Sequence, residues 1–91
     1  MLMNKIMELV EAIRKHPVYG NDGHFTLMAF TTGWKACFQT PNLDDGTGRK
    51  EVKELLAFQS PEEAIIDAAL RRIREVNAMK TVLNDADELG I

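Results

Sequence analysis

The segment Ser60-Pro61-Glu62-Glu63, with the long apolar stripe behind it, constrains the fold more than any other feature of the sequence. The Ser60 hydroxyl can accept a hydrogen bond from the backbone N–H of Glu63, and Pro61 suits the first position of a helix. The carboxylates of Glu62 and Glu63 favour the positive end of the helix dipole. The segment therefore predicts a helix that begins at residue 61. We expect its buried stripe to consist of Ile65, Ile66, Ala69, Ile73 and Val76, and to continue through Met79 and Leu83.

A second helix is predicted near the N-terminus. Apolar residues recur there at helical spacing, and charged residues fall mostly on the opposite face. His16 precedes Pro17, and because the position before a proline disfavours helical backbone, the helix should end near Lys15. The apolar stripe of this helix consists of Leu2, Ile6, Leu9, Val10 and Ile13.

Between the two helices, residues 24–31 and 34–40 are rich in β-branched and aromatic side chains and predict a hairpin. The turn-forming sequence Gly20-Asn21-Asp22-Gly23 separates this hairpin from the first helix. Thr32-Gly33 fits a two-residue connection between the strands. This connection predicts that Phe25 lies opposite Thr40, Leu27 opposite Phe38, Ala29 opposite Ala36 and Thr31 opposite Trp34.

Residues 50–59 fit two structures. Val52, Leu55 and Leu56 share a face of a helix, whereas Val52, Leu56 and Phe58 fit one face of a strand. The short length of the segment and the Gly-rich loop 41–49 before it favour a third strand. The expected fold is therefore α+β: a helix, a three-stranded antiparallel meander and a long C-terminal helix (α-β-β-β-α), arranged in two layers.

The chain has 91 residues and a mass of 10.2 kDa, which predicts one small domain over residues 1–91 with a single modest core. Its net charge of -3 comes entirely from Asp85, Asp87 and Glu88, because residues 1–80 are neutral overall. We expect residues 84–91 to be a frayed acidic end of the last helix or a mobile tail.

The single cysteine, Cys37, excludes an internal disulfide and favours a reducing compartment. The apolar start of the chain is interrupted by Asn4, Lys5 and Glu8 and is followed by no small-residue cleavage site, so we expect no targeting segment. No apolar run approaches the roughly 18 residues that span a bilayer. These features predict a cytoplasmic protein that does not bind membranes.

No group of residues predicts catalysis. His24 shares the expected sheet face of Cys37 but lies roughly 13 Å along the strand, so Cys37 is interpreted as a small half-buried hydrophobe. The loop with Asp44 and Asp45 lacks the alternating ligands of a calcium loop, and Gly46–Lys50 lacks the spacing of a phosphate loop. We therefore expect no enzyme activity, no metal site and no cofactor.

The outer face of the predicted sheet carries Met28, Phe30 and Cys37. If both helices pack on the opposite face, these three side chains form an exposed apolar patch, which is typical of an interface. Helices divided between the two faces, or a folded-back C-terminus, would instead cover the patch and leave a monomer. The main hypothesis is a cytosolic interaction domain that forms a homodimer through this patch and binds a further protein.

The alternative hypothesis is a nucleic-acid-binding module that uses Arg71, Arg74 and Lys80 on the last helix. The expected order of elements resembles that of double-stranded RNA-binding domains. That resemblance implies basic residues at the start of the second helix, where this chain has Glu62 and Glu63. Because no segment of the chain is strongly basic, nucleic acid is the less favoured partner.

Overall fold

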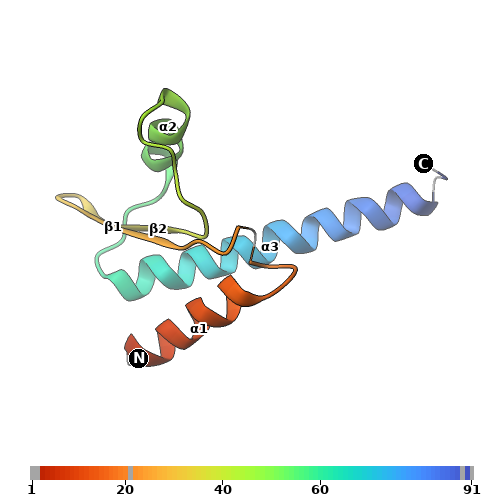
Figure 1. Cartoon of the computed structure of the whole chain (residues 1–91), viewed down its shortest axis with the longest axis horizontal. Coiled ribbons are helices and arrows are strands. Elements are labelled where there is room, and N and C mark those ends of the chain that lie inside the picture. Colours follow the sequence, from red (N-terminus) through yellow and green to blue (C-terminus); the bar gives the residue numbers. More distant parts are fainter. Residues whose placement is uncertain (1–2, 21, 89, 91) are drawn as a thin grey trace.

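The computed structural model describes residues 3–20, 22–88 and 90. Within these residues it contains three helices and one two-stranded antiparallel sheet (Figure 1). The predicted α+β class is therefore confirmed. In chain order the elements are α1 (Met3–Lys15), β1 (Thr26–Phe30), β2 (Gly33–Cys37), α2 (Gly46–Glu54) and α3 (Pro61–Glu88).

The two predicted helices form where their sequence signals place them. At the start of α3, the Ser60 hydroxyl accepts a hydrogen bond of 3.2 Å from the backbone N–H of Glu63. At the end of α1, the Nδ1 atom of His16 accepts from the backbone N–H groups of Val18 and Tyr19, at 3.1 and 3.2 Å. This local bonding turns the chain away from α1 directly after Lys15. Leu2 and Asn21, which the sequence assigned to the first helix and the following turn, lie outside the described residues.

The hairpin is present, but its predicted register is wrong by two residues. Leu27 pairs with Ala36 and Ala29 pairs with Trp34, so Thr31 and Thr32 form the connection and Gly33 belongs to β2. Gly33 has a φ of +137°, and a Cβ atom there would lie 2.5 Å from the carbonyl oxygen of Phe58. The backbone of Phe58 therefore approaches this position so closely that β2 needs a glycine here. Because the shift is even, every side chain keeps its predicted sheet face.

The predicted third strand is wrong, because residues 46–54 form α2. The Asp45 side chain begins this helix by accepting a 2.9 Å hydrogen bond from the backbone N–H of Gly48. Any side chain at Gly48 would overlap the backbone of Asn42, so glycine lets the helix pack directly on the preceding loop. Of the expected strand pairing, one antiparallel bridge between Trp34 and Phe58 is present. The order of elements is α-β-β-α-α rather than α-β-β-β-α.

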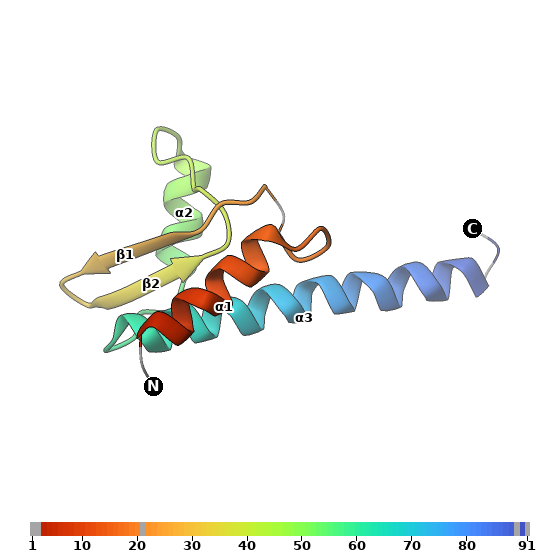
Figure 2. The same cartoon turned by 60° about the horizontal axis from the view of Figure 1, so that its bottom comes forward.

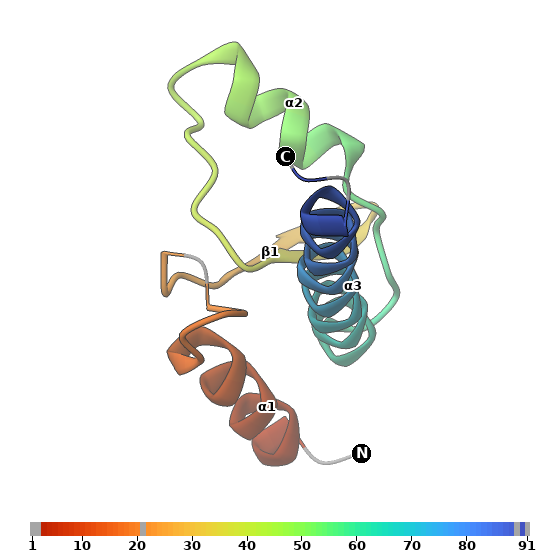
Figure 3. The same cartoon turned by 90° about the vertical axis from the view of Figure 1, so that its right-hand side faces the viewer.

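The hydrophobic core lies where α1, the sheet and the first half of α3 meet (Figure 2). Ile65 of α3 is completely buried at its centre, and the rings of Phe25 and Phe38 pack with their centroids 4.9 Å apart. Figure 3, which looks along α3, shows α1 and α2 on opposite sides of that helix. The buried core residues are Ile6, Val10, Ile13, Ala36, Phe38, Ala64, Ile65, Ala68 and Ala69.

The C-terminal half of α3 extends beyond the rest of the molecule (Figures 1 and 2). The helix continues to Glu88, so residues 84–88 are helical, whereas residues 89 and 91 of the expected acidic tail lie outside the described part of the chain. The single-domain organisation over residues 1–91 stays a prediction. No helix within residues 3–20, 22–88 and 90 has the length and apolar character needed to cross a membrane.

Candidate interaction surfaces

Two of the three predicted interface residues, Met28 and Phe30, lie together on the outer face of β1. They line a shallow groove whose other wall is formed by Leu43 and by Val52 of α2. Lys35 holds the two walls together, because its Nζ atom donates a 2.9 Å hydrogen bond to the carbonyl of Val52 and lies 5.5 Å from the centre of the Phe30 ring. Phe30 is 43% exposed, so this groove remains open to a partner.

The third predicted interface residue, Cys37, does not belong to this groove. Its side chain is buried, and the thiol donates a 3.6 Å hydrogen bond to the carbonyl of Gln39. It faces Leu55 and Arg71 in a separate small cleft. Burial raises the pKa of the Cys37 thiol above its ordinary value, because a thiolate would lose its hydration there. The predicted exposed patch of three residues is therefore not formed.

The burial of Cys37 predicts slow alkylation of the folded protein. Because only the thiolate reacts, we expect iodoacetamide at pH 8 to modify native Cys37 at least about tenfold more slowly than the same chain unfolded in urea. Mass spectrometry of timed samples measures both rates. The raised pKa also means that the native state holds the thiol proton of Cys37 more tightly than the unfolded chain does. The contribution of this thiol to the free energy of unfolding is therefore present at neutral pH and is lost as the pH rises through the folded pKa. Equal rates in the native and unfolded chain would contradict the buried placement.

The predicted basic patch is not one continuous cationic surface. The guanidinium of Arg71 donates to the Asp67 carboxylate and to the carbonyl of Ala36, both at 2.7 Å, so it ties α3 to β2. The ammonium of Lys80 lies 5.5 Å from the centre of the Tyr19 ring. Arg74 is exposed on α3. Two of the three predicted cations are thus engaged in contacts within the chain.

The contacts of Arg71 predict a structural role that Arg74 does not share. Arg71→Ala removes a charge-assisted hydrogen bond and leaves the Ala36 carbonyl without it, which should lower the free energy of unfolding by about 1–2 kcal/mol. Urea denaturation monitored by circular dichroism measures the change. The matched control, Arg74→Ala, alters an exposed residue of the same helix and should stay within about 0.5 kcal/mol of wild type. An equal effect of the two substitutions would show that the Arg71 contacts carry no stability.

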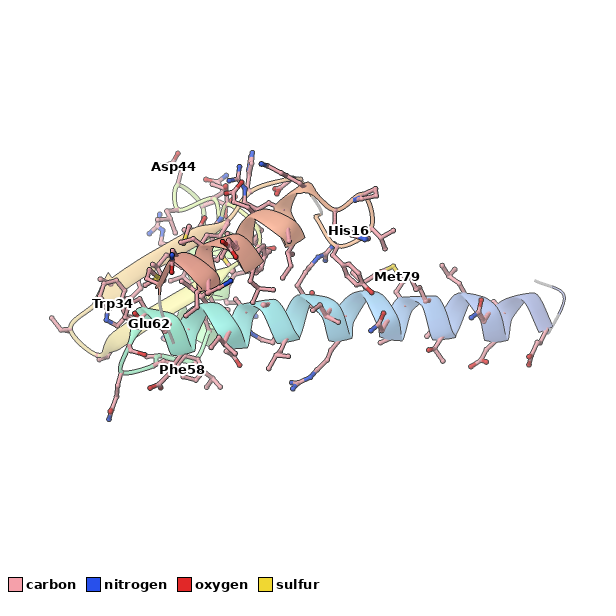
Figure 4. The ribbon with its side chains drawn as sticks, turned by 90° about the horizontal axis from the view of Figure 1, so that it is seen from below. His16, Trp34, Asp44, Phe58, Glu62 and Met79 are labelled. Atoms are coloured by element: carbon pink, nitrogen blue, oxygen red, sulfur yellow. The ribbon has the colours of Figure 1, made fainter. Side chains whose placement is uncertain are left out.

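A further apolar surface lies on the C-terminal half of α3. We call it the distal α3 face and define it by Val76, Met79, Val82 and Leu83. Met79, Val82 and Leu83 are 66%, 65% and 59% exposed. Figure 4 shows Met79 on the side of α3 next to the loop that carries His16, and Val18 of that loop borders the face. The sequence pattern had included Met79 and Leu83, but as part of a buried stripe.

Tyr19 fixes where the covered part of α3 ends. Its carbonyl accepts a 2.8 Å hydrogen bond from Arg72, and its hydroxyl donates a 3.2 Å hydrogen bond to the side chain of Asn77. The loop after α1 is therefore fastened to α3 over residues 72–77. Beyond this attachment the apolar stripe continues through side chains that are more than half exposed.

The histidines occupy positions outside these surfaces. His16 ends α1, and the Nδ1 atom of His24 lies 2.9 Å from the Thr40 hydroxyl and 3.5 Å from the Asp22 carboxylate. In the described part of the chain, no group of three or more His, Cys, Asp or Glu residues is placed to hold a metal ion.

The fold and these surfaces define a small α+β protein in which two helices and a hairpin form the core and exposed apolar residues gather on α3 and beside α2. Residues 24–85 match the family model of cytochrome c oxidase subunit Va. The chain therefore belongs to the cytochrome c oxidase subunit Va family. The matched range covers the hairpin, α2 and most of α3, and it begins after α1.

Three similar relatives are mitochondrial cytochrome c oxidase subunits 5A from Nycticebus coucang, Otolemur crassicaudatus and Eulemur fulvus fulvus. Each is 36% identical to this chain over 67 residues, which is 72% of the chain. The chain spans about 45% of the length of these curated relatives. No solved structure matches it.

These findings correct the function inferred from the residues. The prediction of a cytosolic interaction domain is wrong, because the chain belongs to a family of cytochrome c oxidase subunits. The predicted homodimer and the nucleic-acid alternative are wrong as well, since the relatives are named as subunits of cytochrome c oxidase. The predicted cytoplasmic location is wrong, because those relatives are named mitochondrial. The prediction of no enzyme activity is replaced by a coarser statement: the family consists of subunits of an enzyme.

Proposed function

We propose that this protein is a non-catalytic subunit of a mitochondrial cytochrome c oxidase and acts through contacts with other subunits. The observation that carries this proposal is the family match over residues 24–85. Exposed apolar residues on the distal α3 face support it, because such patches on a small protein mark places where another protein binds.

The environments of His16 and Cys37 support a non-catalytic role. His16 uses its Nδ1 atom to accept backbone hydrogen bonds at the end of α1, so that nitrogen already serves the fold. Cys37 is buried with a raised pKa, which is the opposite of what a nucleophilic thiol requires. The Nδ1 atom of His16 and the thiol of Cys37 are thus both engaged in the fold.

The groove beside β1, lined by Met28, Phe30, Leu43 and Val52, is a second proposed contact surface. It lies next to α2, and α2 is attached to the rest of the molecule by polar contacts, including those from Lys35 to Val52 and from Gln39 to Glu51. A partner could therefore bind in this groove without disturbing the main core.

The proposal is tested by expressing a C-terminally tagged chain in its source cells and separating detergent-solubilised mitochondrial membranes on a native gel. We expect the tagged chain to migrate with the band that oxidises cytochrome c, and purification through the tag to recover that activity. Migration only at the mass of the isolated chain, with no oxidase activity recovered, would overturn the proposal.

A further inference from the structure

The two edges of the sheet differ in whether their backbone groups have partners. At the β2 edge, the backbone N–H of Trp34 donates to the carbonyl of Phe58 at 2.7 Å, and the Trp34 carbonyl accepts from the Phe58 N–H at 2.8 Å. The carbonyl of Ala36 accepts a 2.7 Å hydrogen bond from the guanidinium of Arg71. The segment before α3 and α3 itself therefore satisfy the outer side of β2.

The pairing within the hairpin determines which backbone groups of β1 face outward. Because the backbone of Trp34 bonds to Phe58, its N–H and C=O point away from β1. In an antiparallel pair, such a residue lies opposite one whose own N–H and C=O also point out of the ladder. Trp34 lies opposite Ala29, and Ala36 lies opposite Leu27. The N–H and C=O groups of Leu27 and Ala29 therefore face outward, and we call these four groups the β1 edge.

The β1 edge is open to solvent. Within residues 3–20, 22–88 and 90, no hydrogen bond joins these four groups to another part of the chain. Leu27 and Ala29 are exposed, and Figure 2 shows β2 between β1 and α3. The sequence of β1, Thr-Leu-Met-Ala-Phe, contains no charged residue and no proline, which many proteins place on edge strands to prevent pairing. The β1 edge can therefore pair with a further strand.

The groove beside β1 adds a preference for certain side chains. Successive side chains of a strand point to opposite faces of a sheet. In a strand paired antiparallel with β1, residues bonded to Leu27 and Ala29 share the face of those two residues. The residues between them lie on the face of Met28 and Phe30, which line the groove with Val52. Because the groove lining is mostly apolar, every second residue of such a strand should be apolar.

We propose that the β1 edge binds an extended segment of a partner protein, which adds a third strand antiparallel to β1. Backbone hydrogen bonds to Leu27 and Ala29 supply the affinity, and alternate apolar side chains of the segment enter the groove beside Met28 and Phe30. A helix uses its own backbone groups internally, so it cannot bond to this edge. The inference goes beyond the proposed function and does not rest on it.

The first experiment measures the binding of two labelled seven-residue peptides, both alternating threonine and valine, to the full chain by fluorescence anisotropy. In one peptide the valine amides are N-methylated, so the threonine amides can bond to the β1 edge while the valines enter the groove. In the other peptide the threonine amides are N-methylated. We expect the first to bind at least about tenfold more tightly, because only it combines these bonds with apolar groove contacts. Equal binding of the two, or binding of neither, would overturn the proposal.

Amide hydrogen exchange measured by NMR locates the bound peptide. In the free chain, the amides of Leu27 and Ala29 should exchange faster than those of Met28 and Phe30, which point toward β2. At saturating concentrations of the valine-methylated peptide, we expect exchange at Leu27 and Ala29 to slow at least about tenfold, and more than at Met28 and Phe30. Bound peptide without slower exchange at Leu27 and Ala29 would contradict pairing at the β1 edge.

Matched variants separate the β1 edge from other apolar surfaces. Ala29→Pro removes an outward N–H that the hairpin does not use, so the fold should persist while the peptide binds at least about tenfold more weakly. Met79→Glu combined with Leu83→Glu alters the distal α3 face and should leave binding unchanged. Circular dichroism checks that each variant is folded; if Ala29→Pro does not fold, the amide exchange of the wild-type chain decides. Equal loss in both variants would contradict a site on β1.

A second copy of this chain is the competing occupant of the edge. Analytical ultracentrifugation of the free chain distinguishes the two: a monomer that binds the valine-methylated peptide supports the proposal, whereas a dimer that Ala29→Pro converts to a monomer overturns it. The native gel described above reports only membership of the oxidase, and the peptide measurements report only the β1 edge. Absence of the chain from the oxidase band with retained peptide binding would remove the proposed function alone. The reverse result would remove this inference alone.

Discussion

Ile65→Ala should destabilise the protein more than any other single truncation on α3. The side chain is completely buried where α1, the sheet and α3 meet, so its removal loses apolar contacts and leaves a cavity. The expected loss is about 3 kcal/mol of unfolding free energy. For a domain of this size, this corresponds to a fall in the melting temperature of more than about 10 °C. Thermal and urea denaturation monitored by circular dichroism measure the change.

Leu70→Ala is the matched control for this prediction. Leu70 lies on the same helix, and its truncation to alanine removes the same number of carbon atoms as that of Ile65, but its side chain is 44% exposed. We expect a loss below about 1 kcal/mol, because little buried surface disappears. If the two substitutions had equal effects, the centre of the core would not lie at Ile65.

Gly33→Ala should break the connection between β2 and the segment before α3. The new Cβ would lie 2.5 Å from the Phe58 carbonyl oxygen, and the φ of +137° is one that an alanine rarely adopts. The two hydrogen bonds that join Trp34 to Phe58, at 2.7 and 2.8 Å, cannot then both persist. We expect a loss of about 2 kcal/mol or more.

Trp34 reports this change directly, because it is the single tryptophan of the chain. It is half-buried against the core, so separation from Phe58 should shift its fluorescence emission to longer wavelength. Gly46→Ala is the control: a Cβ at Gly46 meets nothing within 4 Å, and the residue begins α2. This control should leave both emission and stability essentially unchanged. A neutral Gly33→Ala variant would refute the steric role assigned to Gly33.

The helices α1 and α3 could be predicted because their signals are local. The hydroxyl of Ser60 and the backbone of Glu63 lie three residues apart, so the bond that begins α3 depends on nothing distant. His16 and Pro17 likewise end α1 through bonds within the next three residues. Elements whose ends are set by neighbouring residues can be located from a single sequence.

The register of the hairpin and the structure of residues 46–54 could not be predicted in this way, because both depend on distant contacts. Gly33 was assigned to the turn, yet the backbone of Phe58, 25 residues further along, holds it in β2. The glycines around Asp45 suggested a loop, whereas Gly48 packs on Asn42 and Asp45 caps the helix. A glycine can indicate a turn or a close approach, and only the fold decides between them.

The candidate sites show the same division. The pattern on α3 predicted that the buried stripe continues through Met79 and Leu83, but these side chains are 66% and 59% exposed, because the spacing of a stripe does not reveal where the covering elements end. That limit is set by Tyr19 and its bonds to Arg72 and Asn77. On β1, Met28 and Phe30 face outward together, while Cys37 is covered by residues around Leu55, which the sequence had assigned to a strand.

The position of α1 has a consequence for how the family-matched segment holds together. Residues 24–85 contain the hairpin and most of α3, yet Ile6, Val10 and Ile13, which belong to the same core cluster as Ile65, come from α1 and precede that segment. The matched segment alone would leave the side of α3 that packs against α1 open to water. We therefore expect that residues 24–85, which match the family model, do not fold cooperatively without α1. The unit of folding is larger than the segment that identifies the family.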